Sequence, residues 1–278
     1  MCLVACGSST NGTPDSTGDG GTSGKDGGTT SADGATPPKT ALCTDPPSDL
    51  ATSKQRARSC GLGDEAAFFV RATPYTRVVV EVGSTKSAVP RQAAIDQLTK
   101  VMKDLLDKPG GITVKVDAPV ADVGHALTLD EVRAIEDASR TEFAQGDTAV
   151  FYYFVVSESS TDDSAQGKVL GYAYRPTSMV IFQKTIDAVS GGLGQPSRDV
   201  VESTVVAHEL GHVLGLVNTG TAMQSPHEDT AHPKHDSNTK CIMYYANNSS
   251  ELIANLIGGG VTPDFDAACR ADLAAYKR

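Results

Sequence analysis

Residues 208–218, HELGHVLGLVN, constrain the fold more than any other stretch of this 278-residue chain. His208 and His212 are four positions apart, so on a helix their rings project from one face, one turn apart. The positions around them are mostly apolar, which predicts a largely buried helix. Because unpartnered imidazoles are costly to bury, the pattern favours a core helix whose two histidines share a tetrahedral Zn²⁺.

Glu209 and the residues after His212 extend this interpretation. Glu209 lies beside the histidines without being a ligand, in position to accept a proton from a water molecule. Gly215 permits φ > 0, so the chain is expected to leave the helix there and turn back beneath the metal. Asn218 follows, but a carboxamide oxygen is a weak, neutral ligand. Three further candidates for the third corner are His227, His232 and His235.

Composition limits the partners and the extent of the folded unit. The net charge is −10 without a basic cluster, which argues against nucleic acid and anionic membrane surfaces as partners. Residues 7–40 are almost entirely small and polar, so they are expected to form a disordered Gly/Ser/Thr tether. The folded domain is then expected at 41–278, with an N-terminal subdomain at about 70–216 and a C-terminal one at about 217–278. Residues 41–70 could be a pro-segment or a permanent part of it.

The first six residues, MCLVAC, resemble the end of a bacterial lipobox, with residues 1–6 as a truncated signal. In this interpretation Cys6 is lipidated and Cys2 is removed. We therefore expect an exported lipoprotein of the bacterial cell envelope, at the outer membrane or cell surface, or a protein released outside the cell. The lipid anchor would be its sole attachment to a membrane, since no run of eighteen apolar residues exists.

Four other cysteines, an even number, suit disulfides in an exported chain. Proximity in the sequence favours Cys43 with Cys60 and Cys241 with Cys269, among three possible pairings.

Hydrophobic periodicity predicts alternating strands and helices that end in the histidine helix. A capping box of Thr128 and Glu131 opens one of the helices, and regular pattern is lost for about thirty residues after 216. Expected strands are 75–83, 112–116, 148–156, 168–174 and 178–183, and expected helices are 90–108, 129–143, 198–216, 249–257 and 264–276.

HELGHVLGL followed by CIMY resembles the metzincin clan of zinc peptidases, which combine HExxHxxG with a methionine turn. The resemblance covers about residues 75–276. It implies an α/β (α+β metzincin-like) fold: a twisted mixed five-stranded sheet with backing and active-site helices, then a small irregular and helical C-terminal subdomain. By the same resemblance, segment 168–174 is the edge strand along which an extended substrate lies antiparallel.

HDSNTKCIM (235–243) resembles the archaemetzincin pattern, in which a histidine opening this segment is the third zinc ligand. The resemblance implies His235 as that ligand, ahead of His232, His227 and Asn218. Asp236 stands in place of that family's first cysteine and its further cysteines are absent. No second structural zinc of that type is therefore expected.

Two more residues gain roles by resemblance. Met243 matches the methionine of the turn, an apolar floor beneath the ligands. Tyr245 lies two residues later, a spacing found in astacins and serralysins, where the tyrosine assists catalysis. The pair Asp162 and Asp163 could bind Ca²⁺, although a solvated turn is the default for such a sequence.

The chain is thus expected to be a monomeric zinc metalloendopeptidase that hydrolyses extended polypeptides, with Glu209 as general base. The alternative is a noncatalytic surface zinc-binding or adhesion module derived from a peptidase. Glu209 favours the enzyme, because a closed structural zinc site does not need a free carboxylate beside the metal.

Overall fold

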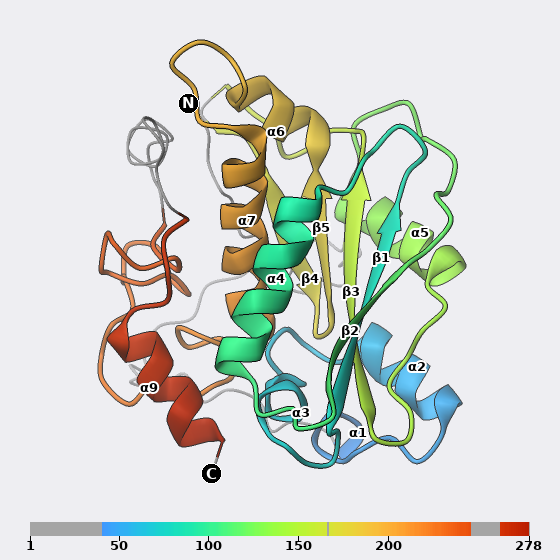
Figure 1. Ribbon diagram of the computed structural model, residues 1–278, viewed down its shortest axis with the longest axis vertical. Coiled ribbons are helices and arrows are strands. Elements are labelled where there is room, and N and C mark those ends of the chain that lie inside the picture. The colour runs from blue at the N-terminus through green and yellow to red at the C-terminus, as the bar shows by residue number, and fades with distance from the viewer. Residues whose placement is uncertain (1–40, 166, 246–261, 278) are drawn as a thin grey trace, which may run out of the picture.

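Figure 1 shows the computed structural model of the chain. The predicted lipidation site Cys6, the predicted tether and the predicted helix at 249–257 lie outside the described residues. Within the described part of the chain, no helix is both long and apolar enough to cross a bilayer. The described residues are 41–165, 167–245 and 262–277.

Five strands form one mixed sheet. They are β1 (Arg77–Ser84), β2 (Gly111–Val116), β3 (Thr148–Val156), β4 (Gly171–Arg175) and β5 (Ser178–Phe182). The strand order is β2-β1-β3-β5-β4, and β4 at the edge is antiparallel to β5 while the other pairs are parallel. This confirms the expected mixed five-stranded sheet, with segment 148–156 at its centre and part of segment 168–174 at its edge.

Helices cover both faces of the sheet (Figure 1). The two long helices, α4 (Gln92–Leu105) and α7 (Arg198–Val213), pack on one face, and α5 (Leu129–Ser139) packs on the other. The shorter helices are α1 (Ala41–Thr44), α2 (Leu50–Ser59), α3 (Ala66–Val70), α6 (Gln183–Val189) and α9 (Ala267–Tyr276).

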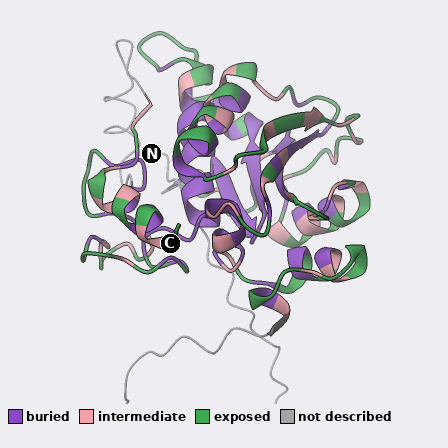
Figure 2. Cartoon of the chain, turned by 60° about the horizontal axis from the view of Figure 1, so that its bottom comes forward, coloured by how far each residue is buried: buried purple, intermediate pink, exposed green. Residues whose placement is uncertain are grey.

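The central strand β3 is apolar on both faces because it contributes to two cores. Successive residues of a strand point to opposite sides, and Figure 2 shows the central strands as buried. Phe151, Tyr153 and Val155 join the core with α4 and α7, whereas Tyr152, Phe154 and Val156 join the core with α5.

The helix expected at 129–143 ends at Ser139. Its predicted capping box is present. The Thr128 side chain accepts a hydrogen bond from the Glu131 N–H, and the Glu131 side chain accepts one from the Thr128 N–H. At the other end, the N–H groups of Thr141 and Glu142 donate to the buried carboxylate of Glu81 in β1. These tertiary bonds replace the last helical turn.

Segment 41–70 is built into the fold. The predicted Cys43–Cys60 disulfide is present, and Phe69 is buried in the main core. Within this segment, Arg56 forms a buried ion pair with Glu65, 2.8 Å between Nε and Oε1. Its core contacts favour a permanent part of the domain over a removable pro-segment.

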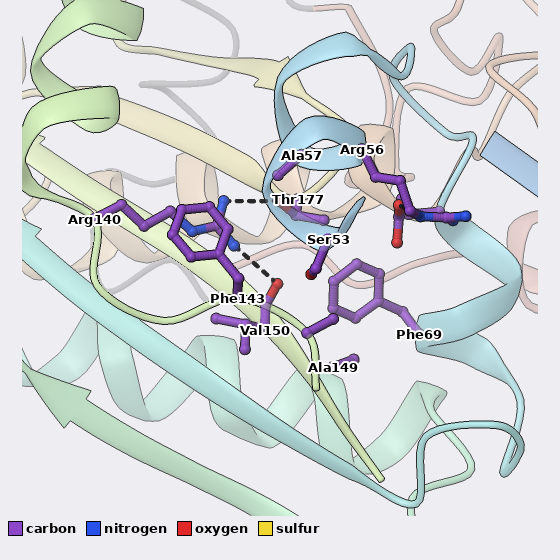
Figure 3. Close-up of a pocket in the computed structure, with 11 residues that line it drawn as sticks. Ser53, Arg56, Ala57, Phe69, Arg140, Phe143, Ala149, Val150 and Thr177 are labelled. Atoms are coloured by element: carbon purple, nitrogen blue, oxygen red, sulfur yellow. Dashed lines mark hydrogen bonds and ion pairs between the residues drawn. The ribbon is translucent and has the colours of Figure 1, made fainter. Parts of the chain in front are cut away.

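A small cavity lies between α2 and the sheet and is shown in Figure 3. Arg140 crosses it and donates to the Thr177 hydroxyl (2.9 Å) and the Val150 carbonyl (3.3 Å). The space holds about one water molecule. None of its lining residues belongs to α7 or to the segment after it, so this cavity is separate from the histidine cluster.

Candidate metal centre

Helix α7 places His208 and His212 side by side in the interior. Ser197 caps the helix by accepting from the Val200 N–H, and every residue from Val201 to Val213 is buried. The Nε2 atoms of the two histidines are 3.2 Å apart. Two nitrogens at about 2.0–2.1 Å from a tetrahedral zinc would be about 3.4 Å apart, so this spacing suits one shared ion.

His235 is the third member of the cluster. Its ring centroid is 5.3 Å from that of His208 and 5.2 Å from that of His212. The three histidines each offer a ligand nitrogen, and these atoms all lie within 4.8 Å of one another. The structure therefore places the preferred third ligand with the helical pair.

The alternative ligands lie elsewhere. Asn218 is exposed, in a left-handed conformation (φ 61°), and its amide donates to the Glu228 carboxylate. His227 is bonded to two aspartates, and His232 is bonded to Asp229. The predicted positive φ at Gly215 is observed at 74°. It begins the turn in which Asn218 is exposed to solvent.

Main-chain carbonyls fix the orientation of two of the rings. His208 Nδ1 donates to the Ile242 carbonyl at 2.7 Å, and His235 Nδ1 donates to the Pro233 carbonyl at 3.1 Å. A carbonyl can only accept, so each Nδ1 carries the proton and each Nε2 keeps its lone pair. His235 Nε2 is buried and has no hydrogen-bond partner within the described residues. Such an orphaned acceptor fits a metal ligand.

The electrostatics of the cluster keep the rings neutral. Burial, with a contribution from His235, lowers the pKa of His208 to about 3. Burial also holds the pKa of His212 well below its ordinary value and lowers that of His235. Neutral imidazole is the form that coordinates a metal. Three converging neutral nitrogens are therefore a donor set suited to zinc.

Glu209 is fully buried beside this cluster and contacts the edge strand. Its Oε2 accepts the N–H of Ala173 in β4 at 2.7 Å. This N–H therefore points away from β5, although Ala173 is paired in register with Met179 of that strand. The carboxylate thus lies where the helix meets the free side of the edge strand.

Met243 lies against α7 at Gly211. It is fully buried, and a Cβ placed on Gly211 would approach its Sδ to 2.2 Å. The same Cβ would lie 2.9 Å from the ring of Phe265. The glycine between the two histidine turns therefore lets the Met243 segment approach the helix backbone closely.

Tyr245 lies at the edge of the metal centre. Its ring centroid is 5.2 Å from that of His235, with the planes tilted by 59°. On another side it stacks on His232, with centroids 4.1 Å apart and an interplanar angle of 22°. It is partly exposed, whereas His235 is buried.

A second buried cluster adjoins the metal centre and was not anticipated from the sequence. His227 bridges two buried carboxylates, with Nδ1 2.7 Å from Asp236 and Nε2 2.8 Å from Asp272 of α9. Burial opposes charging of the ring, but the two carboxylates more than offset it and raise the pKa of His227. Asp236 directly follows His235, so this bridge ties the ligand loop to α9.

The predicted Cys241–Cys269 disulfide is not formed in this structure. The two buried thiols lie next to each other with Sγ atoms 3.8 Å apart, whereas a disulfide needs about 2.05 Å. Each sulfur has a hydrogen-bond partner: Cys269 donates to Asp236, and Cys241 accepts from the Met243 N–H. The prediction from sequence proximity was right that the two cysteines are neighbours and wrong that they form a disulfide, because it did not account for these polar partners.

Asp162 and Asp163, the residues considered for Ca²⁺ binding, accept hydrogen bonds from other groups of the protein. Asp162 accepts the Tyr172 hydroxyl at 2.8 Å, and Asp163 accepts the Val169 N–H at 2.8 Å. Asp163 also forms an ion pair with Lys168. Within the described residues, neither carboxylate belongs to a group that could hold a metal.

Comparison with known proteins gives a family and two similar structures. A family model described as metallo-peptidase family M12 (Reprolysin_5) matches residues 114–255, just over half of the chain. The archaemetzincin (amzA) from Methanopyrus kandleri is 18% identical with a TM-score of 0.48, covering 73% of this chain and 97% of that one. Metalloproteinase-II from Bacteroides fragilis is 14% identical with a TM-score of 0.42, covering 80% and 58%.

A search of curated proteins finds no match. The matched region of the family model contains α7, the edge strand, His235 and Met243. The chain therefore belongs to metallopeptidase family M12.

Proposed function

We propose that this metallopeptidase is a zinc-dependent endopeptidase that cleaves extended polypeptides. The observation that carries the proposal is the convergence of His208, His212 and His235 as neutral, buried ligands next to an α7 carboxylate bonded to the edge strand. A zinc ion held by these rings would supply an acidified water and a Lewis acid for the scissile carbonyl.

Glu209 is proposed as the general base. Its carboxylate would take the proton of the attacking water and return it to the leaving amine, as general acid–base catalysis requires. The Ala173 N–H at 2.7 Å from Oε2 holds this carboxylate in one orientation.

The substrate is proposed to lie along β4. This strand is at the edge of the sheet, and an edge strand can pair with an extended peptide through its main-chain groups. Gly171 and Ala173 have the smallest side chains of β4, and Ala173 contacts Glu209 directly. A polypeptide paired here would run past the carboxylate, which favours internal cleavage.

Tyr245 is proposed to assist by donating its hydroxyl to the oxyanion of the transition state. Support comes from its position against the ring of His235 and its partial exposure, which makes it accessible to a substrate.

The protein is also proposed to be exported, with Cys6 as a lipid anchor. The Cys43–Cys60 disulfide supports export, because disulfides persist in oxidising compartments.

The deciding experiment compares Glu209→Gln with the wild-type protein on casein and on a quenched peptide mixture. Zinc content should be unchanged, because Glu209 is not among the ligands, while kcat should fall about 10²- to 10⁴-fold. A chelator should abolish wild-type hydrolysis and added zinc should restore it. The control is Glu142→Gln, at a half-exposed ion pair with Lys115. Full activity in Glu209→Gln would contradict Glu209 as the general base, and no hydrolysis by the zinc-loaded wild-type protein would favour the alternative, a noncatalytic zinc-binding or adhesion module.

A further inference from the structure

His232, which is not in the metal centre, makes a face-to-face contact with Tyr245. The two ring centroids are 4.1 Å apart and the planes differ by 22°. The tyrosine ring also contacts His235, at 5.2 Å and a tilt of 59°. Tyr245 is therefore held by two imidazoles, one from the metal centre and one from outside it.

Asp229 fixes the His232 ring. Its Oδ2 lies 2.7 Å from His232 Nδ1, and its Oδ1 accepts the Ala231 N–H at 2.9 Å. Because Nδ1 is engaged and the ring face lies on Tyr245, the imidazole has a defined orientation. His232 is absent from the described groups that could hold a metal.

The same turn carries the third ligand. The Asp229 N–H donates to the His235 carbonyl at 2.7 Å, and the His235 N–H donates to the His232 carbonyl at 3.2 Å. His232, Asp229 and His235 are thus parts of one hydrogen-bonded loop. Any displacement of this loop would move the ligand and the surface that supports Tyr245 together.

We propose that His232, oriented by Asp229, is a positioning residue that holds the Tyr245 hydroxyl at the metal centre for peptide hydrolysis. This inference rests on the proposed function, and it assigns His232 no contact with substrate or metal. Aromatic pairs of this kind contribute about 0.5–1.5 kcal/mol, which corresponds to about a 2- to 13-fold change in the population of the held state.

A double-mutant cycle tests the coupling. His232→Ala should lower kcat about 2- to 13-fold with KM and zinc content unchanged, and His232→Phe, which keeps a flat ring, should retain most of the activity. In a Tyr245→Phe background, which lacks the hydroxyl, His232→Ala should have no further effect. An equal loss of kcat in both backgrounds, or failure of His232→Phe to rescue, would overturn the inference.

A second measurement does not depend on activity. In NMR spectra of the zinc-loaded protein, the Tyr245 ring protons, assigned by their loss in Tyr245→Phe, should be shifted by the stacked imidazole. His232→Ala should remove this shift and His232→Phe should keep one. An unshifted wild-type signal would overturn the placement. An inactive wild-type enzyme with a His232-dependent shift would overturn the proposed function but support the placement.

Discussion

Single hydrogen bonds orient two of the three histidine rings of the candidate metal centre. His208 and His235 are each fixed by a main-chain carbonyl, from Ile242 and Pro233. His212 Nδ1 has no such partner within the described residues, so its ring is held by the packing of α7. The carbonyl partners come from the chain after the helix. The geometry of the site therefore depends on that segment as much as on the helix itself.

The third ligand gives a prediction at this scale. His235→Ala should weaken zinc binding by more than the about 10- to 100-fold expected for losing an outer partner of a ligand. Asn218→Ala should leave affinity unchanged, because Asn218 is exposed and bonded to Glu228. Competition with a chromophoric chelator measures both values. Equal weakening in the two variants would show that the Asn218 turn takes part in the site.

Among the elements, α7 and the Met243 segment approach each other closely at Gly211. Gly211 has no side chain where Met243 and Phe265 approach the helix. Met243 and Phe265 belong to the main core, which also contains residues of the sheet, α4 and α7. The HELGH sequence thus has an internal glycine for a packing reason that is independent of metal binding.

Gly211→Ala should therefore destabilise the protein. Alanine gains about 0.5–1 kcal/mol in a helix, but overpacking a core costs about 1–3 kcal/mol. With a Cβ only 2.2 Å from Met243 Sδ, we expect a net loss of about 1–2 kcal/mol in the free energy of unfolding. Urea unfolding measures it. Met243→Ala should relieve the clash, so the double variant should lose less than the sum of the single losses.

The elements differ in how well sequence patterns predicted them. Strand β3 matches its predicted bounds, because eight consecutive apolar residues after Thr148, bounded by polar ones, define a buried strand. The pairing of His208 and His212 was predicted from their spacing of four residues. The place of His235 beside them was implied only by the resemblance to the archaemetzincin pattern. The bridge from His227 to Asp272 spans 45 residues, and no local pattern encodes it. Helices α2 and α3 went unpredicted because their place depends on tertiary contacts.

At the scale of the whole molecule, segment 41–70 packs against the turn after α7. Gly63 has φ 80°, and a Cβ there would lie 1.9 Å from the Thr219 carbonyl oxygen. Thr219 belongs to the turn that begins at Gly215. The disulfide-linked N-terminal segment therefore packs closely against the turn that follows α7.

Gly63→Ala should be more destabilising than Gly124→Ala, its matched control. Gly124 has φ 81°, nearly the same conformation, but nothing lies within 4 Å of its Cβ position. The control therefore isolates the conformational cost of about 1–2 kcal/mol, to which Gly63→Ala adds the clash with backbone. Thermal and urea unfolding compare the two variants. Equal losses would mean that the 61–65 turn does not press on the turn after α7.

The bridge through His227 also relates to the order in which the residues of the metal centre are synthesised. Asp272, on α9, follows the third ligand His235 by 37 residues (272 − 235) and reaches Asp236 through that bridge. A growing chain therefore contains the complete HELGH helix well before the group that fastens the third ligand's loop. The group that anchors the third proposed ligand's loop is therefore synthesised 37 residues after that ligand itself.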